Sequence, residues 1–324
     1  MSTRSDQAQV SDPGAGKDEL GRSGRETKLT SLEPVREPIA VDNASVAARD
    51  FGARGERYRR PMNFGLFVGA LWRARSLVWV LSERELRARY KQAFLGIAWA
   101  FLSPLTYVLV FTLIFNRVTN VDTRGVPYYL FTYVGLIPWG FFSSTLTIGS
   151  LAPLSNVTLM NKVACPREIF TIAAVTTASV DAAITALALP IMFLFAGFVP
   201  RATSLWVPVI LAIQLAFGLG LALLLGSVLF YVRDVRHALP VVAQMLLFAT
   251  PVAYDFSAIP ASWRLTYSIL NPMAPVIDAY RETILFGQAP HWQHLGPAAG
   301  VSFALLGVGY LVFKRLETGF ADVA

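Results

Sequence analysis

The sequence predicts an all-α integral membrane protein with six transmembrane helices, an N-terminal amphipathic interfacial helix and short re-entrant outer helices before the last span. Of its 324 residues, 54% are hydrophobic and only 15% are charged, against about 25% charged in soluble domains. The apolar residues gather in runs that approach the roughly 20 residues needed to cross a bilayer. Aromatic residues lie near the ends of these runs, as interfacial belts require.

The N-terminal part of the chain divides into two regions before the first span. Residues 1–56 are rich in Ser, Gly, Pro and charged residues, so they cannot bury enough apolar surface to offset the entropy of ordering. We predict a disordered cytosolic tail here. Residues 57–92 alternate apolar residues, including Trp72 and Trp79, with arginines, which favours a helix lying in the membrane interface. Residues 93–324 form the predicted six-helix domain.

The spans are predicted at 95–115, 128–150, 169–198, 205–231, 239–254 (a short one) and 296–313. Proline should kink the second span at Pro138 and make the third tilt or fray near Pro190. Residues 255–290 are apolar but repeatedly broken by proline, so we expect short re-entrant helices there. Two rows of small residues predict close helix packing within one chain: Ala174, Ala178, Ala182 and Ala186, and Gly218, Ala222 and Gly226.

Basic residues orient the chain. The tail, the interfacial helix and most short basic loops fall on one side, which is therefore predicted to be cytosolic, with both termini. The net charge of +7 is explained by this pattern and by anionic lipids, and predicts no nucleic-acid partner. The single cysteine, Cys165, excludes a disulfide or a multi-thiolate metal site within one chain.

Few residues suggest chemistry. Gly16-Lys17 is followed by Asp18 and lacks the first glycine of a phosphate-binding loop, so any ATP is expected to be hydrolysed by another chain. We predict no catalytic residue, no metal and no cofactor in this chain. His291 and His294 are spaced like a metal pair, but the sequence shows no third ligand nearby.

Asp181 is the one acidic residue deep in a predicted span, with Thr177 and Thr185 one turn away on either side. An intramembrane carboxylate suggests function. A proton path would usually show several such groups, so a structural contact with the two threonines is the favoured interpretation.

Four stretches resemble the membrane subunits of ABC polysaccharide and polyol-phosphate exporters, the type-2 permeases of O-antigen, teichoic acid and galactan export. They are LSERELRARYKQAFLGIAWAFLSPL, VACPREIF, FYVRDVRHALPVVAQ, and TPVAYDFSAIP with NPMAPVIDAYRETILFG. Cys165 stands where the family usually has an aromatic residue. The resemblance runs from Arg57 to the end of the chain.

The resemblance implies a homodimer with two copies of a separate cytosolic ATPase, which binds ATP and Mg²⁺. It also implies a conduit that carries a lipid-linked polysaccharide across the bacterial inner membrane. The loop at 156–167 and the interfacial helix would receive the movement of the ATPase. The coupling residues would be Lys162, Arg167, Glu168, Arg87 and Arg89. Of these, Arg167 and Glu168 are expected to be accessible to a partner rather than in the core.

Aromatic side chains in the first two spans offer faces on which a sugar chain can slide. The substrate path is predicted at Phe111, Phe115, Tyr128, Tyr129, Tyr133 and Trp139. Asp278, Arg281 and Glu282 can share one helical face, and we predict that they form the polar rim of an outer gate. Tyr267 and Tyr280 would lie beside the passing glycan.

Three other functions stay open at this point. One is an ABC efflux permease for a small lipid or a drug. Another is a membrane-embedded glycosyl- or acyltransferase, which needs acidic or histidine residues gathered at one membrane face. An ion-coupled carrier is a third, which Asp181 alone does not support. The sequence does not identify the polysaccharide or its lipid carrier.

Overall fold

The computed structural model describes residues 74–91, 96, 98–118, 123–160, 162, 165–199, 201–317 and 320. The side chains of the first long helix are described as far as Ile114. The chain divides into two compact units, Met1–Val41 and Asp42–Ala324, and every described residue belongs to the second. The predicted tail and the first part of the predicted interfacial region, 57–73, lie outside the described residues.

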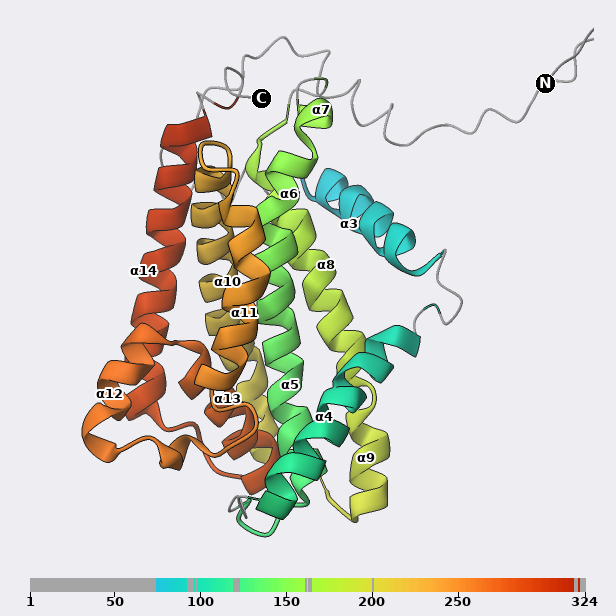
Figure 1. Cartoon of the computed structure of the whole chain (residues 1–324), viewed down its shortest axis with the longest axis vertical. Helices are drawn as coiled ribbons and strands as arrows, with labels where there is room; N and C mark the ends of the chain where they lie inside the picture. The colour runs from blue at the N-terminus through green and yellow to red at the C-terminus, as the bar shows by residue number, and fades with distance from the viewer. Residues whose placement is uncertain are drawn as a thin grey trace, which may run out of the picture. The chain divides into compact units, whose positions relative to one another are not determined.

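The described residues form helices and no strand. Figure 1 shows α5, α8, α10, α11 and α14 running side by side, with α12 and α13 at one end and α3 and α7 at the other. The helices are α3 (Arg75–Tyr90), α4 (Ala98–Val118), α5 (Tyr128–Ser144), α6 (Ser150–Ser155), α7 (Val157–Met160), α8 (Glu168–Ala186), α9 (Leu189–Ala196), α10 (Val207–Leu229), α11 (Val235–Ala249), α12 (Ala261–Leu270), α13 (Met273–Arg281) and α14 (Trp292–Leu316). Two π-turns, η1 (Thr145–Gly149) and η4 (Glu282–Phe286), and two 3₁₀ turns, η2 (Ala202–Trp206) and η3 (Phe256–Ala258), join them.

Four stretches are long and apolar enough to cross a membrane: Tyr128–Ser155, Glu168–Ala196, Ala202–Leu229 and Trp292–Leu316. They correspond to the second, third, fourth and last predicted spans. In the part of the chain that is described, the first and fifth predicted spans appear as shorter apolar helices, Ala98–Ile114 and Val235–Ala249. Length and composition alone therefore support four spans, not the six that were predicted.

Proline affects the two spans differently. The third span was predicted to tilt or fray near Pro190, and its helix is interrupted there: α8 ends at Ala186, and α9 begins with Pro190 in its first turn. In the second span, α5 continues through Pro138, whose carbonyl accepts a hydrogen bond from Gln214 Nε2 at 3.2 Å. The irregular turn of this span is η1, which follows α5.

The Gly218, Ala222 and Gly226 row packs within the chain, as predicted. A Cβ at Gly218 would lie 3.1 Å from the Phe141 ring, and one at Gly226 would lie 3.1 Å from the Ser150 carbonyl oxygen. The row therefore fits α10 against α5, η1 and α6.

A close contact between α10 and α14 was not predicted from the sequence. A Cβ built on Gly309 of α14 would lie 2.2 Å from the carbonyl oxygen of Gly220 in α10. A Cβ on Gly220 would lie 2.5 Å from the main-chain nitrogen of Leu306. Backbone atoms cannot move aside as a flexible side chain can, so these two glycines set the approach of α10 and α14.

We predict that Gly309→Ala destabilises the protein by about 1–3 kcal/mol, because the added methyl group overpacks the contact with Gly220. Gly307→Ala is the matched control, since no atom lies within 4 Å of its added Cβ. Thermal unfolding in detergent measures the difference. Equal melting temperatures for the two variants would contradict the close contact.

Candidate functional site

A cavity of about 710 Å³ lies between α4, α5, η1, α8 and α11, with the end of α3 beside it. This volume is within the usual range for small-molecule sites, about 300–1,000 Å³. Its walls combine aromatic side chains with hydroxyl groups and one amide: Trp99, Tyr107, Trp139, Phe141, Ser103, Ser143, Ser144, Thr147 and Gln244. Arg89, Tyr90 and Asp181 also line it, so the cavity is mainly apolar with one ion pair in its wall.

Asp181 is held by α3. Its carboxylate accepts hydrogen bonds from the Arg89 guanidinium and, at 2.7 Å, from the Tyr90 hydroxyl. Burial and the neighbouring carboxylate raise the pKa of Tyr90 to about 12, so its hydroxyl remains a donor. The threonine partners predicted for Asp181 were wrong. Thr185 donates instead to the main-chain oxygen of Asp181, because a helical threonine hydroxyl reaches the carbonyl four residues back.

Glu168 lies in an ion network at the end where α8 begins and α14 finishes. Its carboxylate, 1% exposed, accepts a hydrogen bond from Lys314 Nζ at 2.7 Å. Lys314 also reaches Glu317 at 3.2 Å, and Arg167 donates to the main-chain oxygen of Glu317. The expectation that Glu168 is accessible to a partner was wrong, because the first turn of α8 packs against the end of α14.

The other predicted coupling residues are more open. Lys162 and Arg87 are exposed, and Arg87 pairs with Glu83 on α3 at 2.5 Å. Arg167 is half-buried and lies over the Phe320 ring at 5.9 Å. Arg89 faces the cavity through its pair with Asp181. Their role in coupling stays a prediction.

Arg281 is buried among carbonyl groups, so its prediction as part of an exposed gate rim was wrong. Its side chain is 1% exposed and lies 3.7 Å over the Phe131 ring. Nε donates to the Phe131 carbonyl at 3.2 Å, and Nη1 donates to the carbonyls of Pro251 at 2.8 Å and Tyr254 at 3.0 Å. Nη2 donates to the Val252 carbonyl. The planar fork of an arginine therefore satisfies the non-helical chain between α11 and η3.

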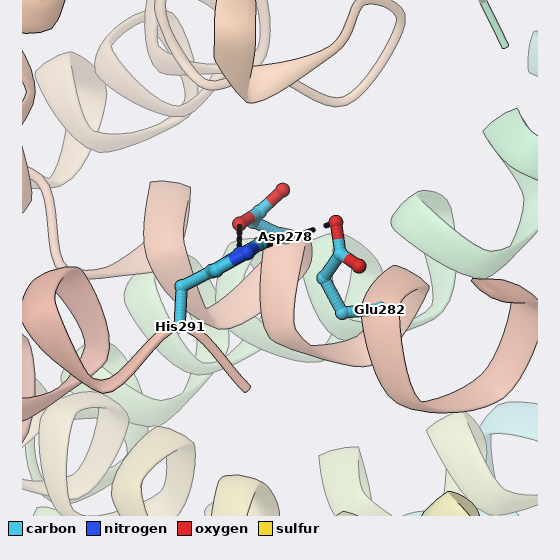
Figure 2. Close-up of side chains that lie close together, drawn as sticks. All are labelled: Asp278, Glu282 and His291. Atoms are coloured by element: carbon cyan, nitrogen blue, oxygen red, sulfur yellow. Dashed lines mark ion pairs between the residues drawn. The ribbon is translucent and has the colours of Figure 1, made fainter. Parts of the chain in front are cut away.

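Asp278 and Glu282 are also buried, at 5% and 0% exposure, which corrects their assignment to a rim. They belong with Arg124, Asp255 and His291 to a group that we call the α13 cluster. The prediction that Asp278, Arg281 and Glu282 share one helical face was wrong. Arg281 points to main-chain carbonyls such as that of Pro251, whereas Asp278 and Glu282 point to His291. Figure 2 shows these two carboxylates and the imidazole facing one another.

Distances in the α13 cluster are short. His291 Nδ1 lies 3.5 Å from Asp278 Oδ2 and 4.0 Å from Glu282 Oε1. Arg124 Nη2 lies 2.7 Å from Glu282 Oε1 and 3.2 Å from Asp255 Oδ2. The sequence interpretation that His291 lacks a third ligand nearby was therefore wrong. His294, its expected companion, packs against the Phe256 ring at 5.3 Å instead.

Two ionisable groups of the α13 cluster have shifted pKa values. The hydrogen bond with Asp278 raises the pKa of His291 above its usual range. Burial acts to raise the pKa of Asp255, but hydrogen bonds from Ser257 and Arg124 outweigh it and the pKa lies below its ordinary value. Asp255 is therefore ionised at neutral pH.

The aromatic residues predicted to line a path mostly pack in the core. Phe111, Tyr128 and Tyr133 are buried, and the two tyrosines donate at 2.8 Å to the carbonyls of Ala253 and Thr185. Tyr129 is half-buried, and the Phe115 side chain lies outside the described residues. Among the six, Trp139 lines the cavity. A path along these residues stays a prediction.

Two tyrosines predicted at the outer gate hold neighbouring elements. Tyr280, buried in α13, donates to Gln214 Oε1 of α10 at 2.8 Å. Tyr267 donates to the carbonyl of Ala249 at the end of α11. Trp99 and Tyr107, which do line the cavity, were not singled out from the sequence. Their aromatic side chains were a sequence signal for such a site. The run around them is apolar on all sides, so the sequence does not show which side of the span faces other helices.

The model of one protein family, described as ABC-2 type transporter, matches residues 76–285. The chain belongs to this family. As an ABC-2 type transporter, it carries the cavity, the Arg89–Asp181 pair and Arg281 within the matched residues. Family membership and the four long apolar helices identify a membrane protein that crosses the bilayer several times.

Three relatives match this chain over nearly their whole length. An O-antigen export system permease protein RfbA of Myxococcus xanthus is 32% identical over 259 residues, 79% of this chain and 98% of the relative. A protein of the same name from Klebsiella pneumoniae is 28% identical, covering 76% of this chain and 94% of the relative. The polysialic acid transport protein KpsM of Escherichia coli is 24% identical, covering 72% and 91%.

We predict that Arg281→Ala destabilises this ABC-2 type transporter by more than about 3 kcal/mol, because it leaves buried carbonyl groups without donors. Arg281→Lys should recover part of the loss, since an ammonium group cannot reach all four carbonyls. Arg236→Ala, at an exposed position of α11, is the control. Denaturation in detergent measures all three. An Arg281→Ala variant as stable as Arg236→Ala would refute the role of the guanidinium.

A second prediction concerns the buried Glu168–Lys314 pair. Lys314→Met should destabilise by about 3–5 kcal/mol, because it leaves the buried Glu168 carboxylate without its cation. Glu168→Gln should cost less, because Lys314 keeps Glu317 as a partner. The double variant should lose at least about 1 kcal/mol less than the sum. The exposed Glu83–Arg87 pair, treated in the same way, should show coupling of about 0.5 kcal/mol. Additive losses at Glu168 and Lys314 would mean that the pair contributes nothing.

Proposed function

We propose that this chain is the permease subunit of an ATP-driven exporter that moves a lipid-linked polysaccharide from the cytosol across the bacterial inner membrane. The observation that carries the proposal is the 32% identity over 98% of the length of an O-antigen export permease. The relative named for polysialic acid transport supports the same substrate class. ATP and Mg²⁺ belong to a separate ATPase subunit, and this chain holds no cofactor.

The cavity between α4, α5, α8 and α11 is the proposed place for the substrate within this chain. Trp99, Tyr107 and Trp139 offer aromatic faces, and hydroxyl groups beside them offer partners for sugar hydroxyls. Arg89 supplies the one cationic group among the lining residues, suited to a phosphate of the lipid carrier. In this structure Arg89 is paired with the Asp181 carboxylate. An anionic substrate would therefore replace Asp181 as the partner of Arg89.

The assembly around the chain follows from the same proposal. The shorter apolar helices α4 and α11 complete six spans, and the end with α3 and α7 faces the cytosol together with both termini. Residues 1–56 are the cytosolic tail, 57–92 the amphipathic interfacial region and 93–324 the permease domain. Two ATPase copies act through groups at this end, the exposed Lys162 and Arg87 and the half-buried Arg167, beside Arg89.

A second copy of this chain completes the conduit. Six large apolar side chains on the described parts of α4 and α11 are more than half exposed in one copy, and contact with a second copy or with lipid removes them from water. They are Trp99, Leu109, Leu113, Val241, Met245 and Phe248.

A pair of substitutions tests both the substrate class and the use of Arg89. In cells whose only copy of the gene encodes Arg89→Ala, surface polysaccharide should fall at least tenfold and lipid-linked polysaccharide should accumulate inside the cell. Asp181→Asn also breaks the ion pair but leaves Arg89 free to bind an anion, so export should continue.

Trp263→Ala, at an exposed position of α12 outside the cavity, is the control, and immunoblots must show equal membrane levels. Equal export loss in Arg89→Ala and Asp181→Asn would mean that the pair is only structural. Unchanged polysaccharide after deletion of the gene would remove the proposed function and favour efflux of another substrate.

A further inference from the structure

We propose that Asp278, Glu282 and His291 bind a divalent cation of the zinc type, between α13, η4 and the start of α14. The three residues offer one ligand atom each, and these atoms all lie within 4.8 Å of one another. The proposal concerns cation binding by the chain itself and does not depend on which substrate is exported.

The geometry is close to that of a metal site. Bonds of about 2.0–2.2 Å in a tetrahedral zinc site place ligand atoms about 3.3–3.5 Å apart. His291 Nδ1 is 3.5 Å from Asp278 Oδ2 and 4.0 Å from Glu282 Oε1. The spacing between His291 and Asp278 already matches a tetrahedral site, and Glu282 would have to move closer to complete it.

Glu282 supplies a second, independent observation. Its side chain is fully buried, and Figure 2 shows one oxygen of its carboxylate facing His291. That oxygen, Oε1, also accepts a hydrogen bond from Arg124, whereas Oε2 accepts none from any residue that the structure describes. Native proteins rarely leave a buried carboxylate oxygen without a donor or an ion, so this carboxylate still has room for a cation as a partner.

The charges around the site leave room for a cation. Asp255, Asp278 and Glu282 bring three negative charges, and Arg124 and the neighbouring Arg281 bring two positive ones. With a neutral His291, these groups carry one more negative than positive charge, which favours the binding of a cation.

The ligand types select the cation. Mg²⁺ and Ca²⁺ prefer six or more oxygen ligands, whereas this site offers one imidazole nitrogen and two carboxylates. Imidazole with carboxylate suits Zn²⁺ and similar transition metals. His291 is 51% exposed, so an ion has access from solvent and keeps a position for water.

The local chain brings the three ligands together. Asp278 and Glu282 lie four residues apart across the junction of α13 and η4, and share a face. Gly287 then adopts a left-handed conformation with φ of 68°, which turns the chain back toward α13 and carries His291 to the carboxylates. A bound cation would hold this return loop against α13.

Zinc titration of the full chain tests the proposal. The protein is purified in detergent through a tag without histidine, stripped with EDTA and titrated with Zn²⁺ by calorimetry. We expect one zinc ion per chain and a higher melting temperature with zinc. His291→Ala should lower the affinity at least tenfold and abolish the thermal shift, and Asp278→Asn should do the same.

His237→Ala is the matched control, because His237 is exposed at the start of α11 and belongs to no ligand group in the described chain. It should bind zinc as the wild type does, and excess Mg²⁺ should not displace the zinc. His291 is half exposed, so its variant folds even if Asp278→Asn does not. Equal zinc affinity in His291→Ala, or no binding by the wild type at saturating zinc, overturns the proposal.

Discussion

The buried Arg281 guanidinium is the interaction on which one end of this protein depends. α11 ends at Ala249, and the chain from Pro251 to Tyr254 runs on without a helix to satisfy its carbonyls. Irregular backbone in a membrane protein survives only where protein or water satisfies it. Arg281 donates to three of these carbonyls and to that of Phe131, so it joins α13, α11 and α5 at one point. With this junction fixed, Tyr128 reaches Ala253 and the α13 cluster assembles beside it.

The opposite end is held by ion pairs between helices. Lys314 joins α14 to the first turn of α8 through Glu168, and Arg89 joins α3 to the middle of α8 through Asp181. α8 is therefore fixed to both neighbours, while the close glycine contact fixes α10 to α14. The cavity lies beside this frame, closed on one side by α4 and α11, whose outward faces are apolar and exposed.

Local signals predicted the fold well, and distant contacts could not be predicted. Hydropathy located four spans, and Pro190 located the break between α8 and α9, because both depend on neighbouring residues. Arg89 and Asp181 are 92 positions apart, and Lys314 and Glu168 are 146 apart, so no periodicity links them. The same polar residues that suggested an exposed gate, Asp278, Arg281 and Glu282, are buried because their partners come from other elements. A charged residue in an apolar sequence predicts that its side chain needs a partner, but not which residue provides it.

The central functional claim is that the cavity between α4, α5, α8 and α11 receives the lipid-linked polysaccharide. Photo-crosslinking in living cells tests it most directly, with a benzophenone amino acid replacing Tyr107 in the cavity or Trp263 on the exposed surface of α12. The account predicts that the residue at 107 captures lipid-linked polysaccharide when the partner ATPase is present, and that the one at 263 does not. Capture of phospholipid alone at 107, or equal capture of the polysaccharide at both positions, would contradict it.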